Sequence, residues 1–289
     1  MYISDEAVLQ MERTRAALNN ILIKKGITTE IGLSLNDMIN MCDNLENGKE
    51  TADLIANQIA DDYRNDYIKK ISGYGFTGKN IPHILLKELE QVSASGMSSI
   101  KTNNLILGNL KYLFSDTGVF SACVGNNFVA PKLINADNSS NVFGNTSFPN
   151  IIIPNFFQDP SMFRNSPNRT LKLLDVTRAG FSGLNSSQIE TVIMRNTNVT
   201  PLGAVDYLTN TQNCTIYVPS DLIESYKTAT NWSTLYARGK VNFVALEGSK
   251  YESKKWFMDE QWYKDEEAYW QNKYQDPDFH IIDDDSWAY

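Results

Sequence analysis

The sequence predicts an α+β chain in which a helical N-terminal region precedes a short β-solenoid and an acidic, aromatic C-terminal helix or tail. Apolar residues recur at near-helical spacing up to residue 95, strand-like runs recur regularly after residue 150, and aromatic and acidic residues crowd into residues 250–289. The domains expected from these changes are residues 1–96, a helical attachment or assembly region; 97–150, an irregular connecting region that could hold the first solenoid coils; 151–247, the solenoid with its end cap; and 248–289, the tail.

Composition and charge limit the kind of protein and the kind of partner. The chain has 289 residues, of which 42% are hydrophobic and 21% charged, so it can bury a core. Its formal net charge is -8, and much of the excess acid lies near the C-terminus. Because nucleic acid is a polyanion, we expect no nucleic-acid partner.

Membrane insertion and disulfide bonds are not expected either. The apolar runs are much shorter than the roughly 20 residues that cross a bilayer. The first residues are acidic and lack the features of a signal peptide, so we expect folding in a cytoplasm. Cys42, Cys123 and Cys214 are odd in number and far apart, which fits neither a disulfide framework nor a Cys-x-x-Cys metal site. All three are expected to be reduced thiols.

Four helices are expected before residue 96. Residues 5–47 should form two short ones, because Gly26 follows two lysines as a helix stop does and Ser34 can cap the next apolar periodic stretch. An amphipathic pattern predicts a third helix over residues 48–70, and a fourth is expected over 81–92. From Ser98 on, β-branched and aromatic residues become more frequent, which places a boundary near residue 96.

The predicted solenoid depends on strand-like runs whose starts lie roughly 20 to 25 residues apart, the period at which one strand and one return loop make a coil. An antiparallel sandwich is the alternative, but no Asn-Gly or Asp-Gly hairpin turn lies between the runs. Residues 126–150, rich in asparagine and serine, resemble an irregular loop or insert. The strand-like runs are 151–153, 171–176, 191–194, 215–218 and 241–244.

One run resembles a known family. Residues 216–233 read IYVPSDLIESYKTATNWS, in which Pro219 should stop a strand, Ser220 should cap a short helix, and Tyr226 and Trp232 should cover the end of the core. This run resembles the closing unit of BspA-like leucine-rich-repeat proteins, which is common in phage virion proteins. The resemblance covers roughly residues 170 to 245 and implies a leucine-rich-repeat-like solenoid.

A second, shorter similarity lies near the start of the chain. Residues 21–39 resemble a small helical module of phage tail and fibre proteins, although a plain helical hairpin explains the pattern equally well. At the other end, a helix over residues 251–274 would carry an aromatic face. That face could dock on a neighbouring subunit or fold back on its own chain, and we favour docking because the tail follows a capped repeat. The candidate assembly residues are Trp256, Trp262, Tyr263, Trp270, Tyr274 and Trp287.

No catalytic, cofactor-binding or metal-binding residue is predicted. The two histidines, His83 and His280, lie in different segments, and the sequence from Gly73 to Lys79 departs from a P-loop because Asn80 follows the lysine. The aspartates between 276 and 285 could offer oxygen ligands to calcium, but a solvated acidic end is the simpler interpretation.

These observations favour a non-enzymatic structural component of a phage virion, in its tail, baseplate or fibre. Its expected partners are other virion proteins, further copies of the same chain and a host cell-surface glycan or protein. The alternatives are a bacterial leucine-rich-repeat module that binds a surface or host, and a glycan-degrading virion enzyme. If the exposed face of the solenoid binds a receptor, the candidate residues are Arg195, Asn196, Asn198 and Tyr207.

Overall fold

The computed structural model describes residues 62–73, 75–114, 118–137, 142–157, 171–178, 184, 188–208 and 210–282, with the backbone alone at 135–137, 156–157 and 178. The chain divides into two compact units, 1–46 and 47–289. All described residues belong to the second unit. The two helices expected within 5–47, and most of the one expected over 48–70, lie outside the described residues.

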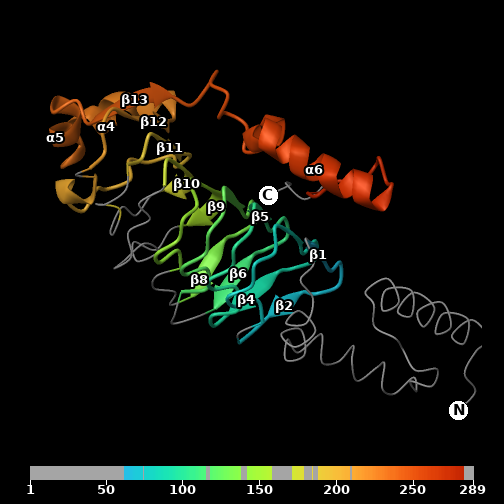
Figure 1. The fold of residues 1–289 in the computed structure, drawn as a ribbon. Helices are drawn as coiled ribbons and strands as arrows, with labels where there is room; N and C mark the ends of the chain where they lie inside the picture. Colours follow the sequence, from blue (N-terminus) through green and yellow to red (C-terminus); the bar gives the residue numbers. More distant parts are fainter. Residues whose placement is uncertain are drawn as a thin grey trace, which may run out of the picture. The chain divides into compact units, whose positions relative to one another are not determined.

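Two parallel sheets organise the described chain (Figure 1). Up to β9 successive strands alternate between the sheets, so each coil adds one strand to each sheet. The nine-stranded sheet has the order β1 (Asp62–Arg64), β3 (His83–Leu85), β5 (Asn104–Ile106), β7 (Asn127–Val129), β9 (Asn150–Phe157), β10 (Leu173–Arg178), β11 (Thr191–Met194), β12 (Cys214–Val218) and β13 (Val241–Ala245). The four-stranded sheet has the order β2 (Lys70–Ile71), β4 (Gln91–Ser93), β6 (Tyr112–Phe114) and β8 (Asn135–Asp137).

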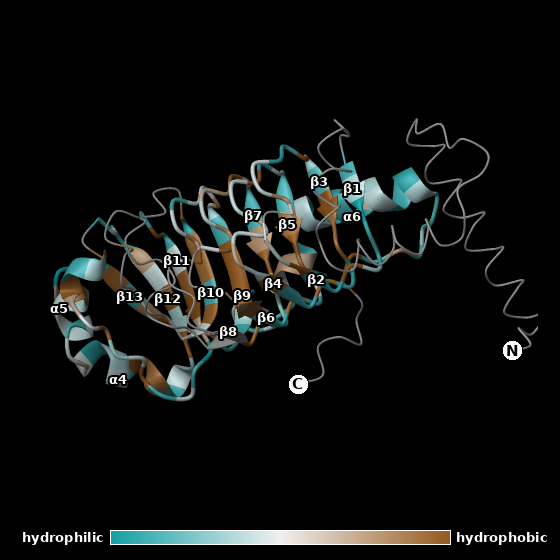
Figure 2. Ribbon diagram, turned by 90° about the horizontal axis from the view of Figure 1, so that it is seen from below, coloured by the Kyte–Doolittle hydropathy of each residue, from teal (hydrophilic) through white to brown (hydrophobic). Residues whose placement is uncertain are grey.

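The main core lies between the two sheets. The middle residue of each short strand points inward, and strand alternation sends the residues before and after it to the outer face. Figure 2 shows the apolar colour running through the strands. Removing a fully buried ring such as Phe128 would cost about 3–5 kcal/mol, so this core supplies a large share of the stability. The inward residues of the two sheets include Ile84, Leu105, Phe128, Ile151, Leu174, Val192, Ile216 and Phe243, opposite Ile71, Val92 and Leu113.

The predicted fold class is wrong. The nine-stranded parallel sheet begins at Asp62, about 90 residues before the first expected strand, and β1 to β4 occupy the part of 62–96 that was expected to be helical. Residues 81–92, expected to be one helix, hold β3, a turn and β4. The described helices are few: three α-helices and three 3-10 turns. Residues 126–150, expected to be an irregular loop, contain β7 and β8.

The physical reason for this error is a turn that imitates helical spacing. After each short strand the chain turns through four residues, and the backbone N–H of Leu89 donates to the carbonyl of Leu86 at 3.2 Å. The same turn recurs at Leu107–Leu110 and Ala130–Leu133. As a result Leu86, Leu89 and Val92 are buried three positions apart, an interval that also occurs along the face of a helix.

A two-helix insertion covers the end of the core beside β13. It consists of α4 (Ile223–Thr228) and α5 (Trp232–Ala237), which follow the 3-10 turn η2 (Ser220–Leu222) between β12 and β13. The predicted cap at Ser220 is wrong, because Pro219 holds the cap position of η2 and Leu222 that of α4, while the Ser220 backbone N–H donates to Glu247 at 2.9 Å. The turn η1 (Val205–Leu208) contacts α5.

The chain then returns along the nine-stranded sheet. We name residues 246–282 the C-terminal segment; it contains η3 (Trp256–Asp259) and α6 (Gln261–Tyr274), which lie on the outer face of that sheet (Figure 1). Between residues 62 and 282, in the parts that the structure describes, no helix is both long and apolar enough to cross a membrane.

Candidate functional site: the contact between the sheet and the C-terminal segment

The C-terminal segment packs against an apolar row on the outer face of the nine-stranded sheet. Its members hold the same register position in β3, β5, β7, β9 and β11, and in β10 that position belongs to Asp175. A parallel sheet normally needs both faces covered, and here one chain provides both covers. The row consists of Leu85, Ile106, Val129, Ile152 and Ile193, and the segment contributes Leu246, Tyr251, Trp256, Phe257, Tyr263, Trp270, Phe279, Ile281 and Ile282.

A row of asparagines runs beside the apolar row. Asn150 Nδ2 donates to Asn127 Oδ1 at 2.7 Å, and Asn127 Nδ2 donates to Asn104 Oδ1 at 2.7 Å. Asn104 Nδ2 then donates to Glu266 Oε2 of α6 at 2.9 Å. All three amides therefore donate in the direction of one carboxylate that is only 5% exposed. Such aligned amides polarise one another and stabilise the buried charge.

The same carboxylate of Glu266 also holds a histidine. His83 Nδ1 lies 2.8 Å from Glu266 Oε1, and the His83 ring stacks on Tyr269 with centroids 3.7 Å apart. The Tyr269 hydroxyl donates to Asp62 at 2.6 Å, and Lys273 forms an ion pair with Asp62. Glu266, Tyr269 and Lys273 share one face of α6 because residues three, four and seven apart on a helix are neighbours. We call these contacts the Glu266 anchor.

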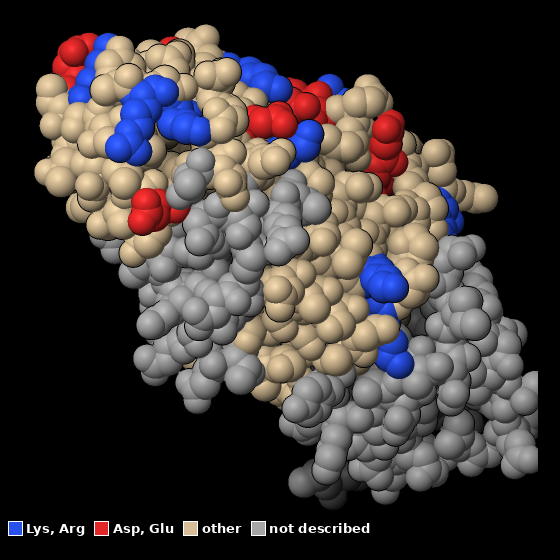
Figure 3. Space-filling view, turned by 60° about the vertical axis from the view of Figure 1, so that its left-hand side comes forward, with Lys and Arg blue, Asp and Glu red and all other residues tan. Residues whose placement is uncertain are grey.

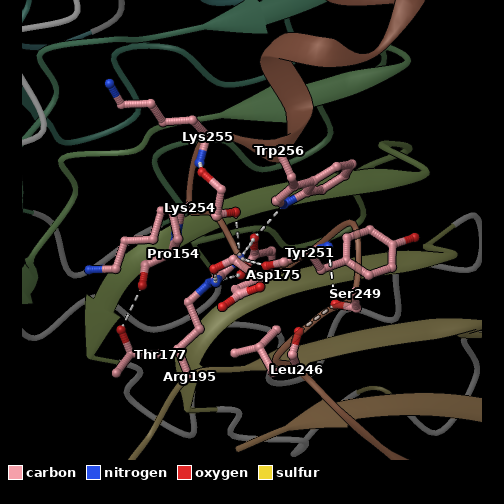
Figure 4. A network of polar contacts seen from close by, with 12 residues as sticks. Pro154, Asp175, Thr177, Arg195, Leu246, Ser249, Tyr251, Lys254, Lys255 and Trp256 are labelled. Atoms are coloured by element: carbon pink, nitrogen blue, oxygen red, sulfur yellow. Dashed lines mark hydrogen bonds and ion pairs between the residues drawn. The ribbon is translucent and has the colours of Figure 1, made fainter.

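A second anchor holds the other end of the segment (Figure 4). Arg195, directly after β11, binds Asp175 of β10 through two hydrogen bonds of 3.1 Å. Its remaining N–H groups donate to the carbonyls of Tyr251 at 2.7 Å and Glu252 at 2.9 Å. The indole N–H of Trp256 donates to Asp175 Oδ2 at 2.7 Å. This Arg195 anchor therefore binds the backbone and one side chain of the segment together.

Burial determines the electrostatics of the Arg195 anchor. The side chains of Arg195 and Asp175 are only 7% and 0% exposed. Complete desolvation raises the pKa of the Asp175 carboxyl, while Arg195 and the Trp256 indole oppose the rise. Burial and the charge of Arg195 lower the pKa of Lys254, which contacts Asn155 of β9. A buried pair of this kind is expensive to break because one charge is left without its partner.

The predicted receptor-binding residues do not share one role. Arg195 is mostly buried in its anchor. Asn196 is half-buried and Asn198 is exposed. Tyr207, half-buried, packs against the main core. Arg195 therefore binds this chain's own segment, which its sequence position could not reveal.

The predicted cap residues lie together at the end of the core. Tyr226 and Trp232 are fully buried and pack against Phe243 at centroid distances of 5.2 and 5.6 Å. Thr200 joins them: its N–H donates to the Tyr226 hydroxyl at 2.9 Å, and its carbonyl accepts from the Trp232 indole at 2.8 Å. Pro219 follows β12 directly and precedes η2.

The predicted assembly residues mostly contact their own chain. Trp256, Tyr263 and Trp270 are buried in the contact with the sheet, and Trp262 is half-buried there. Tyr274 remains 43% exposed, with the Arg64 guanidinium 4.3 Å from its ring centre. Trp287 lies outside the described residues. Of the two arrangements that the sequence left open for the tail, the described residues show the fold-back on the same chain.

The polar groups of this contact hold the C-terminal segment on the sheet, and we call the Glu266 anchor and the Arg195 anchor together the latch. Its polar groups are directed at one another, and Asn103 Nδ2 lies 3.4 Å from the remaining His83 ring nitrogen. A search of the described residues finds no group of three or more His, Cys, Asp or Glu side chains arranged to hold a metal ion. Comparison of the chain with protein-family models finds no match, and comparison with curated proteins finds none either.

Sequence reasoning missed most of the latch. Asp62, Asp175 and Glu266 carry no motif, because their partners come from distant parts of the chain. The asparagines did carry a signal: Asn104, Asn127 and Asn150 follow one another at intervals of 23 residues, each at the start of a strand. Such a periodic asparagine is what a stacked parallel repeat uses for a ladder of side-chain hydrogen bonds.

Proposed function

We propose that this chain is a structural component of a phage virion, in its tail, baseplate or fibre, and that it acts by assembling with other proteins. The observation that carries the proposal is the run 216–233, which resembles the closing unit of BspA-like proteins found in virions. In the structure this run supplies the two buried aromatic rings that cover the core, Tyr226 and Trp232.

The construction of the described part supports a mechanical role. Successive coils join through ladders of parallel strands, so neighbouring coils hold each other in register. The Glu266 and Arg195 anchors add cross-links between residues far apart in the sequence, 162 positions for the bond between Asn104 and Glu266. A solenoid that is cross-linked along its length is suited to transmit force or to hold its partners at a fixed spacing.

The charge distribution supports protein partners. On the face drawn in Figure 3, charged side chains gather toward one end and along one border, and they are sparse over the middle of the described surface. The sparsely charged middle of this surface fits the uncharged centre of a protein contact.

Particle association tests the proposal. An antibody raised against the recombinant chain would be used on phage particles purified through a density gradient, and on washed cells and cell walls of a bacterium that carries the gene without phage. We expect the chain to band with intact particles at a fixed ratio to the capsid protein. If the chain were found on the surface of phage-free cells and not in particles, the virion proposal would be wrong and a bacterial surface module would be the better interpretation.

A further inference from the structure

The outer face of the nine-stranded sheet is a docking surface with a defined occupant. Its apolar row offers five side chains from Leu85 to Ile193, and its polar groups stand at two places, Asp62 to Asn150 and Asp175 with Arg195. The C-terminal segment meets all of them. A segment that fits this face therefore needs an aromatic helix with a carboxylate in its middle. Before the helix it needs an indole N–H and backbone carbonyls that can accept hydrogen bonds.

A short connection joins this occupant to the rest of the chain. After β13 ends at Ala245, the Leu246 N–H still donates to the Val218 carbonyl at 2.8 Å, and Glu247 accepts from the Ser220 N–H at 2.9 Å. The bonds of Gly248 and Ser249 are local, such as Ser249 Oγ to the carbonyl of Leu246 at 2.6 Å. Gly248 has φ +73, a conformation that a glycine reaches and leaves without strain. A change in a few backbone angles here redirects the whole segment and leaves both sheets unchanged.

From this arrangement we propose that the C-terminal segment of one copy docks on the nine-stranded sheet of a second copy, so that copies of this chain assemble by exchanging the segment. The proposal rests on the assembling role proposed above and names the partner for it. Every contact of the closed chain is available to the exchanged pair, because the segment and the sheet are the same in both copies. Such an exchange is a low-cost way to form a dimer.

The two anchors make the exchange specific for the same segment. A foreign helix without a carboxylate at the position of Glu266 leaves the Asn104 amide and His83 unmatched, and one without the Trp256 indole leaves Asp175 short of a donor. Unmatched buried polar groups oppose binding of other partners. In a dilute sample the segment binds its own sheet, because the short connection holds it near that sheet at an effective concentration of order mM. In a particle the copies are crowded, so the sheet of a neighbouring copy competes for the segment.

Paired cysteines test the exchange in the full chain. A Cβ atom on Gly108 would lie 3.8 Å from the Ile282 Cα, within reach of a disulfide if residue 282 were also cysteine. It would also lie 3.1 Å from Ile282 Cγ1, so a Gly108→Ala chain, which must stay monomeric when diluted, controls for exchange forced by the substitution. One variant carries Gly108→Cys and the other Ile282→Cys, both with Cys42→Ser, and the two are co-expressed and oxidised. Cys123 and Cys214 can stay, because burial raises the pKa of each thiol to about 12 and keeps them unreactive.

Only exchange brings the two new cysteines together in this mixture. If copies pair at random, about half of the dimers should become disulfide-linked on a non-reducing gel. The matched control is Asn272→Cys, an exposed position of the C-terminal segment on α6, which should give no linked dimer with Gly108→Cys. A single chain with both cysteines, Gly108→Cys and Ile282→Cys, should close on itself when diluted.

Two outcomes would overturn the proposal. One is closure of the double variant within its own chain together with no linked dimer in the co-expressed pair. The other is equal linking by the Asn272→Cys control, which would show random collision. If the Gly108 variant fails to fold, the pair Asn155→Cys with Lys254→Cys repeats the test at the Arg195 anchor with a bis-maleimide cross-linker, because the Lys254 side chain spans the gap between the two positions. Particle association is measured separately, so a chain that bands with virions yet never exchanges refutes this proposal alone.

Discussion

The Arg195 anchor gives the sharpest test of how the C-terminal segment is held. Replacing Arg195 with alanine leaves the Asp175 carboxylate, 0% exposed, without its cation, and it frees the carbonyls of residues 251 and 252. Breaking a buried pair in this way costs about 3–5 kcal/mol. That is a large part of the about 5–15 kcal/mol by which a domain is stable. With an m-value of about 2–3 kcal/mol/M in urea, the unfolding midpoint should fall by about 1–2.5 M.

The assay is urea denaturation followed by tryptophan fluorescence, with hydrogen exchange of residues 251–256 to detect local release. The double variant Arg195→Met, Asp175→Leu is the control, because it removes both charges. It frees the same two carbonyls as Arg195→Ala and also leaves the Trp256 N–H unmatched, at about 1–3 kcal/mol. It should be more stable than Arg195→Ala. A loss below about 1 kcal/mol for Arg195→Ala, or a double variant no better than the single one, would refute the view that an uncompensated buried charge dominates.

Three further predictions concern other parts of the molecule. Glu266→Gln keeps an acceptor for Asn104 and should cost less than Glu266→Leu, by about 1–3 kcal/mol in chemical denaturation; equal costs would contradict the role of the amide row. Trp232→Ala should cost about 3–5 kcal/mol by the same measurement, whereas Asn272→Ala on the surface should cost under about 0.5 kcal/mol, and similar values would argue against the cap. Burial raises the pKa of Cys123 and Cys214 from 9.0 to about 12, so between these values the unfolded chain loses its thiol protons first and stability should fall as the pH rises, less steeply in Cys214→Ala.

The later strands could be predicted because each is a continuous apolar or β-branched run. The runs at 151–153, 191–194, 215–218 and 241–244 all lie within strands of the nine-stranded sheet. Part of the expected C-terminal helix is present as α6, and two of its aromatic residues, Tyr263 and Trp270, are buried. In these elements local composition and tertiary burial favour the same structure, so the local pattern is sufficient.

The earlier coils could not be predicted in this way because their strands have only two or three residues. In such a coil most buried side chains come from turns, as at Leu86 and Leu89, and turns have no fixed period. The informative comparison is between coils: HILLKELEQV, NLILGNLKYL and NFVAPKLINA begin at residues 83, 104 and 127 and place their apolar residues at matching positions. The spacing of apolar residues within one of these stretches favours a helix, whereas an alignment of the three stretches with one another reveals the repeat.

The direction of the asparagine row explains why the segment binds in one alignment. Asn104 donates to Glu266, Asn127 donates to Asn104, and Asn150 donates to Asn127, so all three bonds run in one direction. Reversing the segment would place a different side chain at Asn104, and the donor Nδ2 would face no carboxylate. An apolar row alone tolerates sliding, because Leu, Ile and Val contacts change little with a shift of one strand spacing. The polar anchors remove that freedom, so a segment that leaves its own sheet can return only to the same site on this sheet or on the sheet of another copy.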